Sequence, residues 1–476
     1  MRRTAVAWFW CCCLAIFPTT FAMSLSTRFW TACTACRGVG KIKRPPTRKQ
    51  VQRHKRLKPN EPLPPRWEPC TSCESSGLVV ASSQAPENAS LPSMAIIGGG
   101  IAGLALAAAC RHRGIPHCVY ERDQTFDDRS QGYGLTMQQA SKALRSFGID
   151  LQGGITSTKH VVHTADGTVV GEWGLRQWGR SSSAKEPKRQ NVHIARQSLR
   201  RQLWDAAGGS SANIAWNHRL LYYEETEEQK VKLYFQVGDE TVEVETDHLV
   251  GADGIRSQVR QQLIGEETTP LRYLDCIVML GICPAASLSH VESELLDGAT
   301  VFQTADGVTR VYMMPYSADE YMWQLSFPMP EAEAADLSRQ GPAALQAQAL
   351  DRCSSWHTPV PEILRATPIE LISGYPVYDR ELLTLEQLQT SDNVTLIGDA
   401  CHPMSPFKGQ GANQALLDAL ALVRMDDRTE FCRDVCDRAQ RKVTASAQAA
   451  SLLHSPVAVQ RGNVTRGGAA AALQCD

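Results

Sequence analysis

The chain has 476 residues, of which 43% are hydrophobic and 21% charged, an ordinary globular composition that predicts two or three packed domains. Its formal net charge of −1 excludes a whole-chain attraction to nucleic acid or to an anionic membrane surface. The charge is uneven, since no acidic residue precedes Glu61 while lysine and arginine are dense between Arg37 and Lys58.

Residues 1–23 are predicted to be a targeting segment. Met1-Arg2-Arg3 is basic, and the uncharged apolar run of residues 5–17 is shorter than a bilayer span. Small residues at Thr20 and Ala22 suit a cleavage site, so we expect no membrane span in the mature chain. The lack of acids past this site is typical of a transit peptide. We expect passage through the secretory pathway to an organelle such as a plastid, with secretion or the endoplasmic reticulum lumen as the alternative.

Residues 24–92 form a basic segment that is rich in proline and serine and holds two C-x-x-C pairs. Cys33 and Cys36 lie in "CTACRGVG", and Cys70 and Cys73 lie in "CTSCESSG". The two units resemble the zinc module of a co-chaperone, the second imperfectly. Four thiolates suit one tetrahedral Zn²⁺, so a structural zinc site is a candidate here, and unstructured transit sequence is the alternative. Cys11, Cys12 and Cys13 lie together in the targeting segment, and the other cysteines are scattered singly, which favours buried free thiols.

From residue 93 onward the pattern is that of a folded α/β protein. Residues 93–265 contain buried strands at "MAIIGGG" and "HCVYERD", a helix at "IAGLALAAACRHRG" and a second helix at "RQSLRRQLWDAAG". Residues 266–390 are rich in strands and include one helix between residues 341 and 354. Residues 391–476 begin with the strand "NVTLIGDA" and become helical as far as Leu453. The order predicts an α/β domain interrupted by a separate sheet domain.

The segment from Gly98 to Gly103 fits the G-x-G-x-x-G pattern between a strand and a helix. Gly98 permits a tight turn, Gly100 lets a pyrophosphate approach the backbone, and Gly103 allows close packing of helix and strand. Glu121 ends the next strand, where a carboxylate can accept hydrogen bonds from a ribose. The pattern predicts a dinucleotide site and leaves FAD and NAD(P) open.

Two further motifs follow at strand ends, Asp253 in "HLVGADGIRSQVR" and Asp399 in "TLIGDACHPMSPFKGQGAN". With "GGGIAG" they resemble the three motifs of the class A flavoprotein monooxygenases, the para-hydroxybenzoate-hydroxylase-like group that includes salicylate hydroxylases. The resemblance covers residues 94–468. It implies a Rossmann-like FAD-binding domain with an inserted antiparallel-sheet substrate domain. The FAD-binding domain would comprise residues 93–265 and 391–476, and the substrate domain residues 266–390.

The same resemblance implies which residues bind FAD. Glu121 would hold the adenosine ribose, Asp253 would lie near the pyrophosphate, and Asp399 would bind the ribityl hydroxyls. The glycine turn near Gln410 opens a helix whose positive end would stabilise the reduced flavin. The implied cofactor-binding residues are Gly98, Gly100, Gly103, Glu121, Arg122, Arg129, Gly134, Arg196, Asp253, Asp399, Gly409, Gly411, Ala412 and Asn413.

The implied reaction uses NAD(P)H and O₂. Reduced FAD would take up oxygen as a C4a-hydroperoxyflavin and transfer one oxygen atom to an aromatic or polyene small molecule, by hydroxylation or epoxidation. No catalytic base is assigned. Candidate substrate-lining residues, for which plain sheet core is an equal alternative, are Phe302, Gln303, Tyr312, Met314 and Trp323. An FAD oxidoreductase without oxygenation, or a flavin-fold binding protein with a zinc docking module, is the competing interpretation.

Cys401 and His402 stand side by side in the third motif, as a thiol nucleophile and its base or two metal ligands would. Further ligands at a metal-binding spacing, such as a second C-x-x-C or H-x-x-x-H, are missing nearby. We therefore predict that neither residue is catalytic and that the cofactor is bound by Asp399 and the glycine turn.

Overall fold

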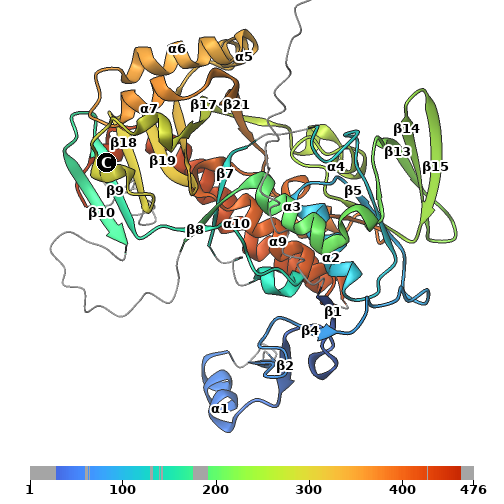
Figure 1. Cartoon of the computed structure of the whole chain (residues 1–476). Helices are drawn as coiled ribbons and strands as arrows, with labels where there is room; N and C mark the ends of the chain where they lie inside the picture. Colours follow the sequence, from blue (N-terminus) through green and yellow to red (C-terminus); the bar gives the residue numbers. More distant parts are fainter. Residues whose placement is uncertain are drawn as a thin grey trace, which may run out of the picture.

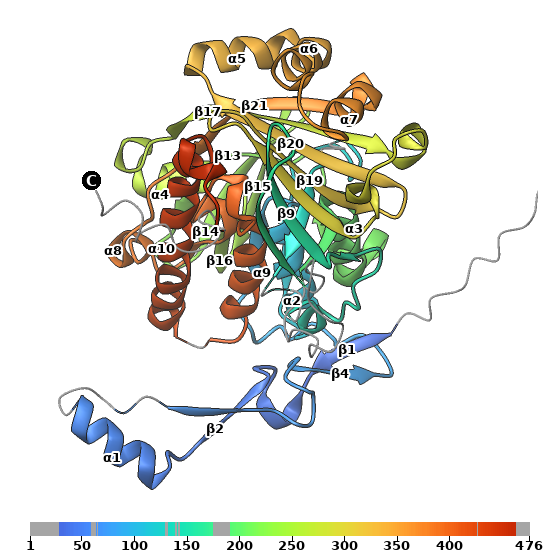
Figure 2. The same ribbon diagram turned by 90° about the vertical axis from the view of Figure 1, so that its left-hand side faces the viewer.

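The computed structural model describes residues 28–58, 63, 65–128, 132–138, 140, 143–174, 191–425 and 427–462. Figures 1 and 2 show a small amino-terminal module beneath a larger body, which contains a parallel sheet with helices and a second, larger sheet. The predicted targeting segment and Arg129 lie outside the described residues.

The parallel sheet has the strand order β12 (Ile214–Ala215), β6 (His117–Tyr120), β5 (Met94–Ile97), β16 (His248–Gly251) and β22 (Val394–Leu396). All four neighbouring pairs are parallel. Helix α2 (Ile101–Arg111) packs between this sheet, α3 (Arg196–Ala207) and α9 (Gly411–Leu422). Because α2 is enclosed on every side, it is buried from Ile101 to Cys110, which explains its alanine-rich sequence.

The second sheet has seven strands, in the order β10 (Val169–Gly174), β9 (Lys159–Thr164), β18 (Thr300–Ala305), β19 (Arg310–Ser317), β20 (Glu320–Pro328), β17 (Arg272–Pro284) and β21 (Ile372–Asp379). It is antiparallel except where β9 meets β18. Helices α5 (Glu331–Gln340), α6 (Pro342–Cys353) and α7 (Val360–Ala366) cover one face, as Figure 2 shows. The mixed α/β class and the separate strand-rich domain agree with the sequence prediction.

The boundary predicted between the two domains needs a correction. Residues 159–174 were assigned with residues 93–265 to the α/β domain, but β9 and β10 belong to the edge of the second sheet. A turn at Asp166 and Gly167 joins these two strands. Alternating sequence identifies a strand but not its partner, and β18 lies more than a hundred residues further along the chain.

The remaining elements complete the body and form the module. The body also contains β7 (Gly134–Met137), β8 (Ile155–Thr156) and β11 (Val192–Ala195) in one sheet, β13 (Arg219–Glu225), β14 (Val231–Val237) and β15 (Glu240–Thr246) in another, and α4 (Gln258–Ile264), α8 (Leu385–Leu388) and α10 (Arg428–Leu453). The cysteine module, residues 28–81 as far as they are described, contains β1 (Phe29–Ala32), β2 (Lys41–Arg44), α1 (Arg48–Leu57), β3 (Arg66–Pro69) and β4 (Leu78–Ala81). Across the described residues, no helix combines the length and apolar character of a membrane span.

Alternation along the strands of the second sheet divides the candidate substrate residues between its two faces. Phe302 and Trp323 are fully buried in the core beneath α5, α6 and α7, which corrects their assignment as substrate-lining residues. Gln303, Tyr312 and Met314 lie on the opposite face. There Met314 and Tyr312 belong to a cluster with Tyr133 and Phe407, which come from the α/β domain. This opposite face is the one that meets the α/β domain.

Trp323→Ala is expected to lower the free energy of unfolding by about 3–5 kcal/mol, because it empties a packed site. The Trp323 ring lies against Gly281, and its Nε1 donates a hydrogen bond of 2.8 Å to Thr367 Oγ1. Urea unfolding followed by circular dichroism measures the change, and Val308→Ala, at a position 52% exposed, is the control. Equal stability of the two variants would contradict the core assignment.

Candidate cofactor-binding site

Four segments meet at the carboxyl edge of the parallel sheet. Gly98 follows β5, Glu121 follows β6, Asp253 follows β16 and Asp399 comes shortly after β22. The strand order reverses direction at β5, since β6 lies on one side and β16 on the other. Open α/β sheets bind their ligands at such a switch point. The three motifs identified along the sequence are therefore brought to one place.

The three glycines of the first motif have different surroundings. A Cβ on Gly103 would lie 1.9 Å from the Gly98 carbonyl oxygen, and Gly98, at φ +108°, would bring its own Cβ 2.6 Å from the Ala252 oxygen. Gly100 has nothing within 4 Å of the corresponding position. Gly98 and Gly103 thus permit close packing of the backbone, while Gly100 borders open space at the N-terminus of α2.

Two charged side chains fix the loop around Gly99. Glu121 accepts the Gly99 N–H through Oε2 at 2.5 Å and the Asp123 N–H through Oε1 at 3.0 Å. Arg200, on α3, donates from Nε to the Gly99 oxygen at 2.9 Å and from Nη1 to the Phe126 oxygen at 2.7 Å. Sequence reasoning missed Arg200, whose only signal was a cation on the buried face of an amphipathic helix. The neighbouring Arg122 is exposed.

The two aspartates occupy different positions. Asp253 Oδ2 accepts the backbone N–H groups of Gln258 and Val259 at 2.8 and 3.3 Å, at the start of α4, whereas Oδ1 is buried without a partner. Asp399 is exposed. Desolvation by the surrounding protein nevertheless raises its pKa, against the opposing effects of His402 and Arg196. Each carboxylate thus has oxygen atoms left for a ligand.

The N-terminus of α9 faces the same place. Gly409 adopts the left-handed conformation, at φ +58°, and lets the chain turn into the helix. A Cβ on Gly411 would lie 3.5 Å from Asp399 Oδ1. Asn413 donates from Nδ2 to the oxygens of Thr136 and Gly409, both at 2.9 Å, and accepts the Gln138 N–H at 3.0 Å through Oδ1. The Asn413 side chain therefore ties α9 to β7, and Ala412 next to it is partly buried.

Gly134 and Arg196 join this site to the second sheet. A Cβ on Gly134 would lie 1.8 Å from Met314 Cε, and the Gly134 N–H contacts Met322 Sδ at 2.9 Å. Arg196 opens α3, donates its backbone N–H to Tyr133 and lies over the Tyr133 ring. It also acts electrostatically on Asp399. Residues from both domains therefore converge between the two sheets.

These features fit a dinucleotide that carries a flavin. Gly100 leaves room for a pyrophosphate at a helix N-terminus, and Asp399 and the start of α9 lie apart from it at the same sheet edge. A profile of the FAD-binding domain family matches residues 92–425. The chain belongs to the FAD-binding domain family.

Relatives of this flavoprotein are monooxygenases. FAD-dependent monooxygenase thnD of Trichoderma harzianum is 29% identical over 349 residues, which are 70% of this chain and 83% of that protein. The 6-hydroxynicotinate 3-monooxygenase of Bordetella bronchiseptica is 26% identical over 346 residues, 71% and 83% of the two chains. The flavoprotein is a class A FAD-dependent monooxygenase, which confirms FAD as a cofactor and the predicted class of enzyme.

A solved structure confirms the fold. HpxO of Klebsiella pneumoniae, in complex with FAD and uric acid, aligns with the flavoprotein at a TM-score of 0.62 and 22% identity. The alignment covers 77% of this chain and 89% of HpxO.

Cys401 and His402 have structural surroundings in the flavoprotein. His402 Nε2 and Asp418 Oδ2 are 2.6 Å apart and both side chains are fully buried. Burial acts to lower the pKa of His402, but the Asp418 carboxylate outweighs it and the pKa is raised. Asp418 also accepts the Gly398 N–H and pairs with Arg438. Burial raises the pKa of Cys401 well above that of a free thiol, so Cys401 is no ready nucleophile.

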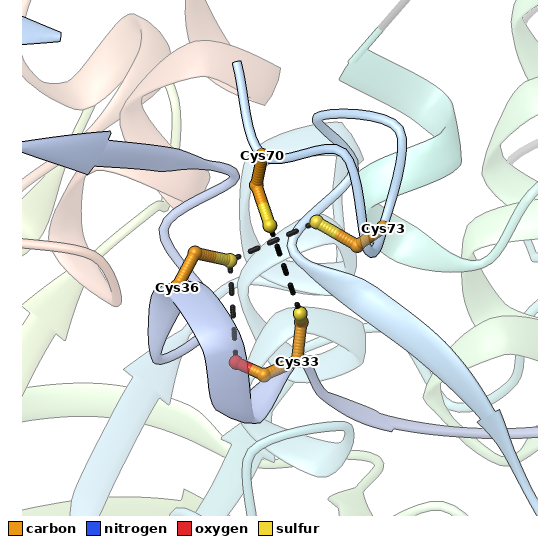
Figure 3. Close-up of side chains that lie close together, drawn as sticks. All are labelled: Cys33, Cys36, Cys70 and Cys73. Carbon is orange, nitrogen blue, oxygen red and sulfur yellow. Dashed lines mark hydrogen bonds between the residues drawn. The ribbon is translucent and has the colours of Figure 1, made fainter. Parts of the chain in front are cut away.

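The four cysteines of the module form one cluster, shown in Figure 3. Their Sγ atoms all lie within 4.8 Å of one another, with Cys33 4.0 Å from Cys70 and Cys36 3.7 Å from Cys73. A tetrahedral Zn²⁺ with bonds of about 2.3 Å sets its sulfur atoms about 3.8 Å apart. Throughout the described residues, this is the one group of three or more such side chains close enough to share a metal ion.

The two C-x-x-C units fold alike around the cluster. Gly40 N–H donates to Cys36 Sγ at 3.1 Å, and Gly77 N–H donates to Cys73 Sγ at 3.2 Å. The backbone N–H groups of the first cysteine of each pair bond across to the other unit, from Cys33 to Gly77 and from Cys70 to Gly40. Ser75, at φ +69°, takes the place that Gly38, at φ +77°, has in the first unit. The imperfect second unit therefore keeps the same turn.

Gly100→Ala is expected to weaken FAD binding, whereas Gly103→Ala is expected to destabilise the fold. Alanine at position 100 meets open space and an allowed φ of −82°, so the variant should melt near the wild type but bind FAD more weakly, because its methyl group occupies the approach of the pyrophosphate. Alanine at position 103 meets a backbone oxygen and should destabilise the fold by about 2 kcal/mol. Thermal unfolding and flavin titration of the apoprotein measure both effects. Unchanged flavin affinity in Gly100→Ala would contradict the assignment.

Proposed function

We propose that the flavoprotein uses NAD(P)H and O₂ to hydroxylate or epoxidise an aromatic or polyene small molecule. The observation that carries the proposal is the convergence of Asp399, the N-terminus of α9 and the face of the second sheet that meets the α/β domain. The named activity of the Bordetella relative, oxygenation of a ring carbon of 6-hydroxynicotinate, supports an aromatic substrate.

Bound FAD would supply the redox chemistry and the activation of oxygen. The glycine loop and Glu121 would hold the adenosine and pyrophosphate end, with Arg200 fixing the loop. Asp253, through its buried Oδ1, would take a hydrogen-bond donor near the pyrophosphate or an ordered water. These residues act by binding and orientation, and none of them needs to exchange a proton with the substrate.

At the flavin end, Asp399 would accept hydrogen bonds from the ribityl hydroxyls. The first N–H groups of α9 have no partners within the helix and point outward from its positive end. They would stabilise negative charge on the pyrimidine edge of the reduced flavin. Asn413 would act indirectly, by fixing the start of α9 against β7.

The substrate would lie against the face of the second sheet that carries Gln303, Tyr312 and Met314. Arg310 lies on the same face and is 4% exposed. Its Nε donates to Gln303 Oε1 at 2.7 Å, its guanidinium lies 5.1 Å from the Tyr312 ring centroid, and no described carboxylate pairs with it. Burial lowers the pKa of Arg310 to about 10, which leaves it cationic at neutral pH. The uncompensated cation favours a ring with an anionic or oxygen-bearing substituent over an unsubstituted polyene.

The purified protein should be yellow and should oxidise NADH or NADPH faster when its substrate is present. A panel of phenolic, carboxylated and heteroaromatic compounds, with a carotenoid as the polyene, tests the proposal by oxygen uptake and by mass spectrometry of the product. One added oxygen atom supports it. Nicotinamide oxidation that yields only hydrogen peroxide with every compound, or a colourless protein that cannot be reconstituted with FAD, would refute it.

Asp399→Ala is expected to weaken FAD binding on the order of tenfold or more, through loss of charge-assisted hydrogen bonds. Cys401→Ser should leave bound flavin nearly unchanged, because the Cys401 thiol is buried away from the open site. Flavin fluorescence after dialysis compares the two variants at equal protein concentration. The opposite ranking would restore a functional role for the thiol.

The proposal includes one structural Zn²⁺ bound by Cys33, Cys36, Cys70 and Cys73. It is supported by sulfur separations close to the edges of a tetrahedron and by the two N–H···S hydrogen bonds, which favour thiolates. Metal analysis of the purified full chain should give about one zinc per molecule, and Cys36→Ser with Cys73→Ser should remove it. A wild-type protein without bound metal would refute this site.

The proposed route into the secretory pathway and then an organelle rests on the sequence of residues 1–23 and on the lack of acidic residues in the stretch that follows them. A fluorescent protein fused after residue 60 should leave the cytosol, and retention there would exclude both this route and secretion.

A further inference from the structure

Two arginines of the FAD-binding domain form hydrogen bonds to the cysteine module, one to each C-x-x-C unit. Arg113 Nη2 donates to the Gly38 oxygen at 3.1 Å, two residues after Cys36. Arg424 Nη2 donates to the Ser76 oxygen at 2.6 Å, three residues after Cys73. The guanidinium groups also fill the space beside the glycine turns, since a Cβ on Gly77 would lie 3.1 Å from Arg424 Nη2.

These two cations lack a negatively charged partner if the cysteines are neutral thiols. Both side chains are partly buried, and the Nε atom of each is enclosed without a hydrogen bond. In the described part of the chain, no carboxylate forms an ion pair with either guanidinium. Arginine stays protonated in proteins, so two positive charges are enclosed beside the cluster. Enclosed charges without a partner are strongly destabilising.

Zinc binding would supply the missing charge. Four thiolates carry four negative charges and Zn²⁺ carries two positive ones, so the loaded cluster has a net charge of about −2. Two arginines match this charge. The charges of the cluster and of the two arginines therefore balance only when the metal is bound.

The arginines also lie at a particular place in the FAD-binding domain. Arg113 lies two residues after Arg111, the last residue of α2, and donates from Nη1 to the Ala109 oxygen at 3.0 Å. Arg424 lies two residues after Leu422, the last residue of α9. The N-termini of the same two helices, at Gly100 and Gly411, face the proposed FAD site. At about 1.5 Å per residue, each helix separates the cluster from that site by roughly 17 Å. Figures 1 and 2 both show the module below this end of the domain.

We propose that the zinc-loaded cluster pairs with Arg113 and Arg424 and thereby fastens the C-terminal ends of α2 and α9, so that bound zinc strengthens FAD retention. This inference rests on the zinc site proposed above. Because linkage is reciprocal, bound FAD would also strengthen zinc retention. The module would then stabilise the cofactor site through α2 and α9, whether or not it also binds a partner.

The test uses the full chain and measures two quantities, the rate of zinc release to a colorimetric chelator and the temperature at which flavin fluorescence appears on heating. Arg113→Gln with Arg424→Gln removes both charges. Arg53→Gln with Arg56→Gln is the matched control, because it removes two exposed charges from α1 of the same module. Arg113→Lys with Arg424→Lys keeps the charges and loses the planar guanidinium.

The glutamine pair is expected to release zinc about tenfold faster than the wild type and to release flavin at a lower temperature. Removing zinc from the wild type should lower the flavin-release temperature to that of the glutamine pair. The control pair should match the wild type, and the lysine pair should retain zinc better than the glutamine pair.

Equal zinc-release rates in the glutamine and control pairs would refute the pairing of the zinc cluster with the two arginines, while the zinc site itself could still be correct. A flavin-release temperature that is the same with and without zinc in the wild type would do the same, and this comparison needs no folded variant. Absence of zinc from the wild type would overturn both proposals.

Discussion

The contact between the loops that follow β5 and β16 is the constraint on which the rest of the site depends. Gly98 lies so close to the Ala252 oxygen that a side chain there is excluded, and Gly103 in turn packs on the Gly98 oxygen. These contacts bring the N-terminus of α2 to the sheet edge with open space at Gly100. Glu121 and Arg200 then fix Gly99 between them. The loop around Gly99 is therefore already fixed before a ligand binds. Binding would then cost little conformational entropy for ordering this loop.

A second set of buried polar contacts sets the position of α9. Asp418, in the middle of this helix, accepts the Gly398 N–H and pairs with His402 and Arg438. The buried network replaces the water that each charge would lose, and it fixes the loop of Asp399 to the helix that opens beside it. His402 therefore has a structural reason to lie in this motif. The two ends of the proposed FAD site are positioned by different interactions, glycine packing at one end and a buried ion network at the other.

The sequence predicted those parts of the fold that depend on local geometry. The spacing of Gly98, Gly100 and Gly103 reflects contacts within one strand–turn–helix unit, and the C-x-x-C units likewise reflect tight turns. Contacts between segments that lie far apart along the chain could not be predicted from the sequence. Alternation in β18 and β20 showed two faces but not that Phe302 and Trp323 face the helices, and no local signal paired β9 with β18. Helix α1 was missed because Val51 and Leu57 are its only aliphatic residues and none of its residues is buried, so the sequence offers little apolar signal for a helix.

The size of the cysteine module explains why metal and docking belong together. Its core consists of the four cysteines with Ile42 and Val79 packed against them, far too little apolar surface to offset the entropy of ordering the chain. Small domains of this kind fold when a metal supplies the free energy, and the apparent strength of binding then includes folding. Two enclosed arginines at the domain surface add to this energy only when the cluster is charged. If the proposed zinc is bound, the order of the module and the fixation of α2 and α9 would therefore depend on the same ion.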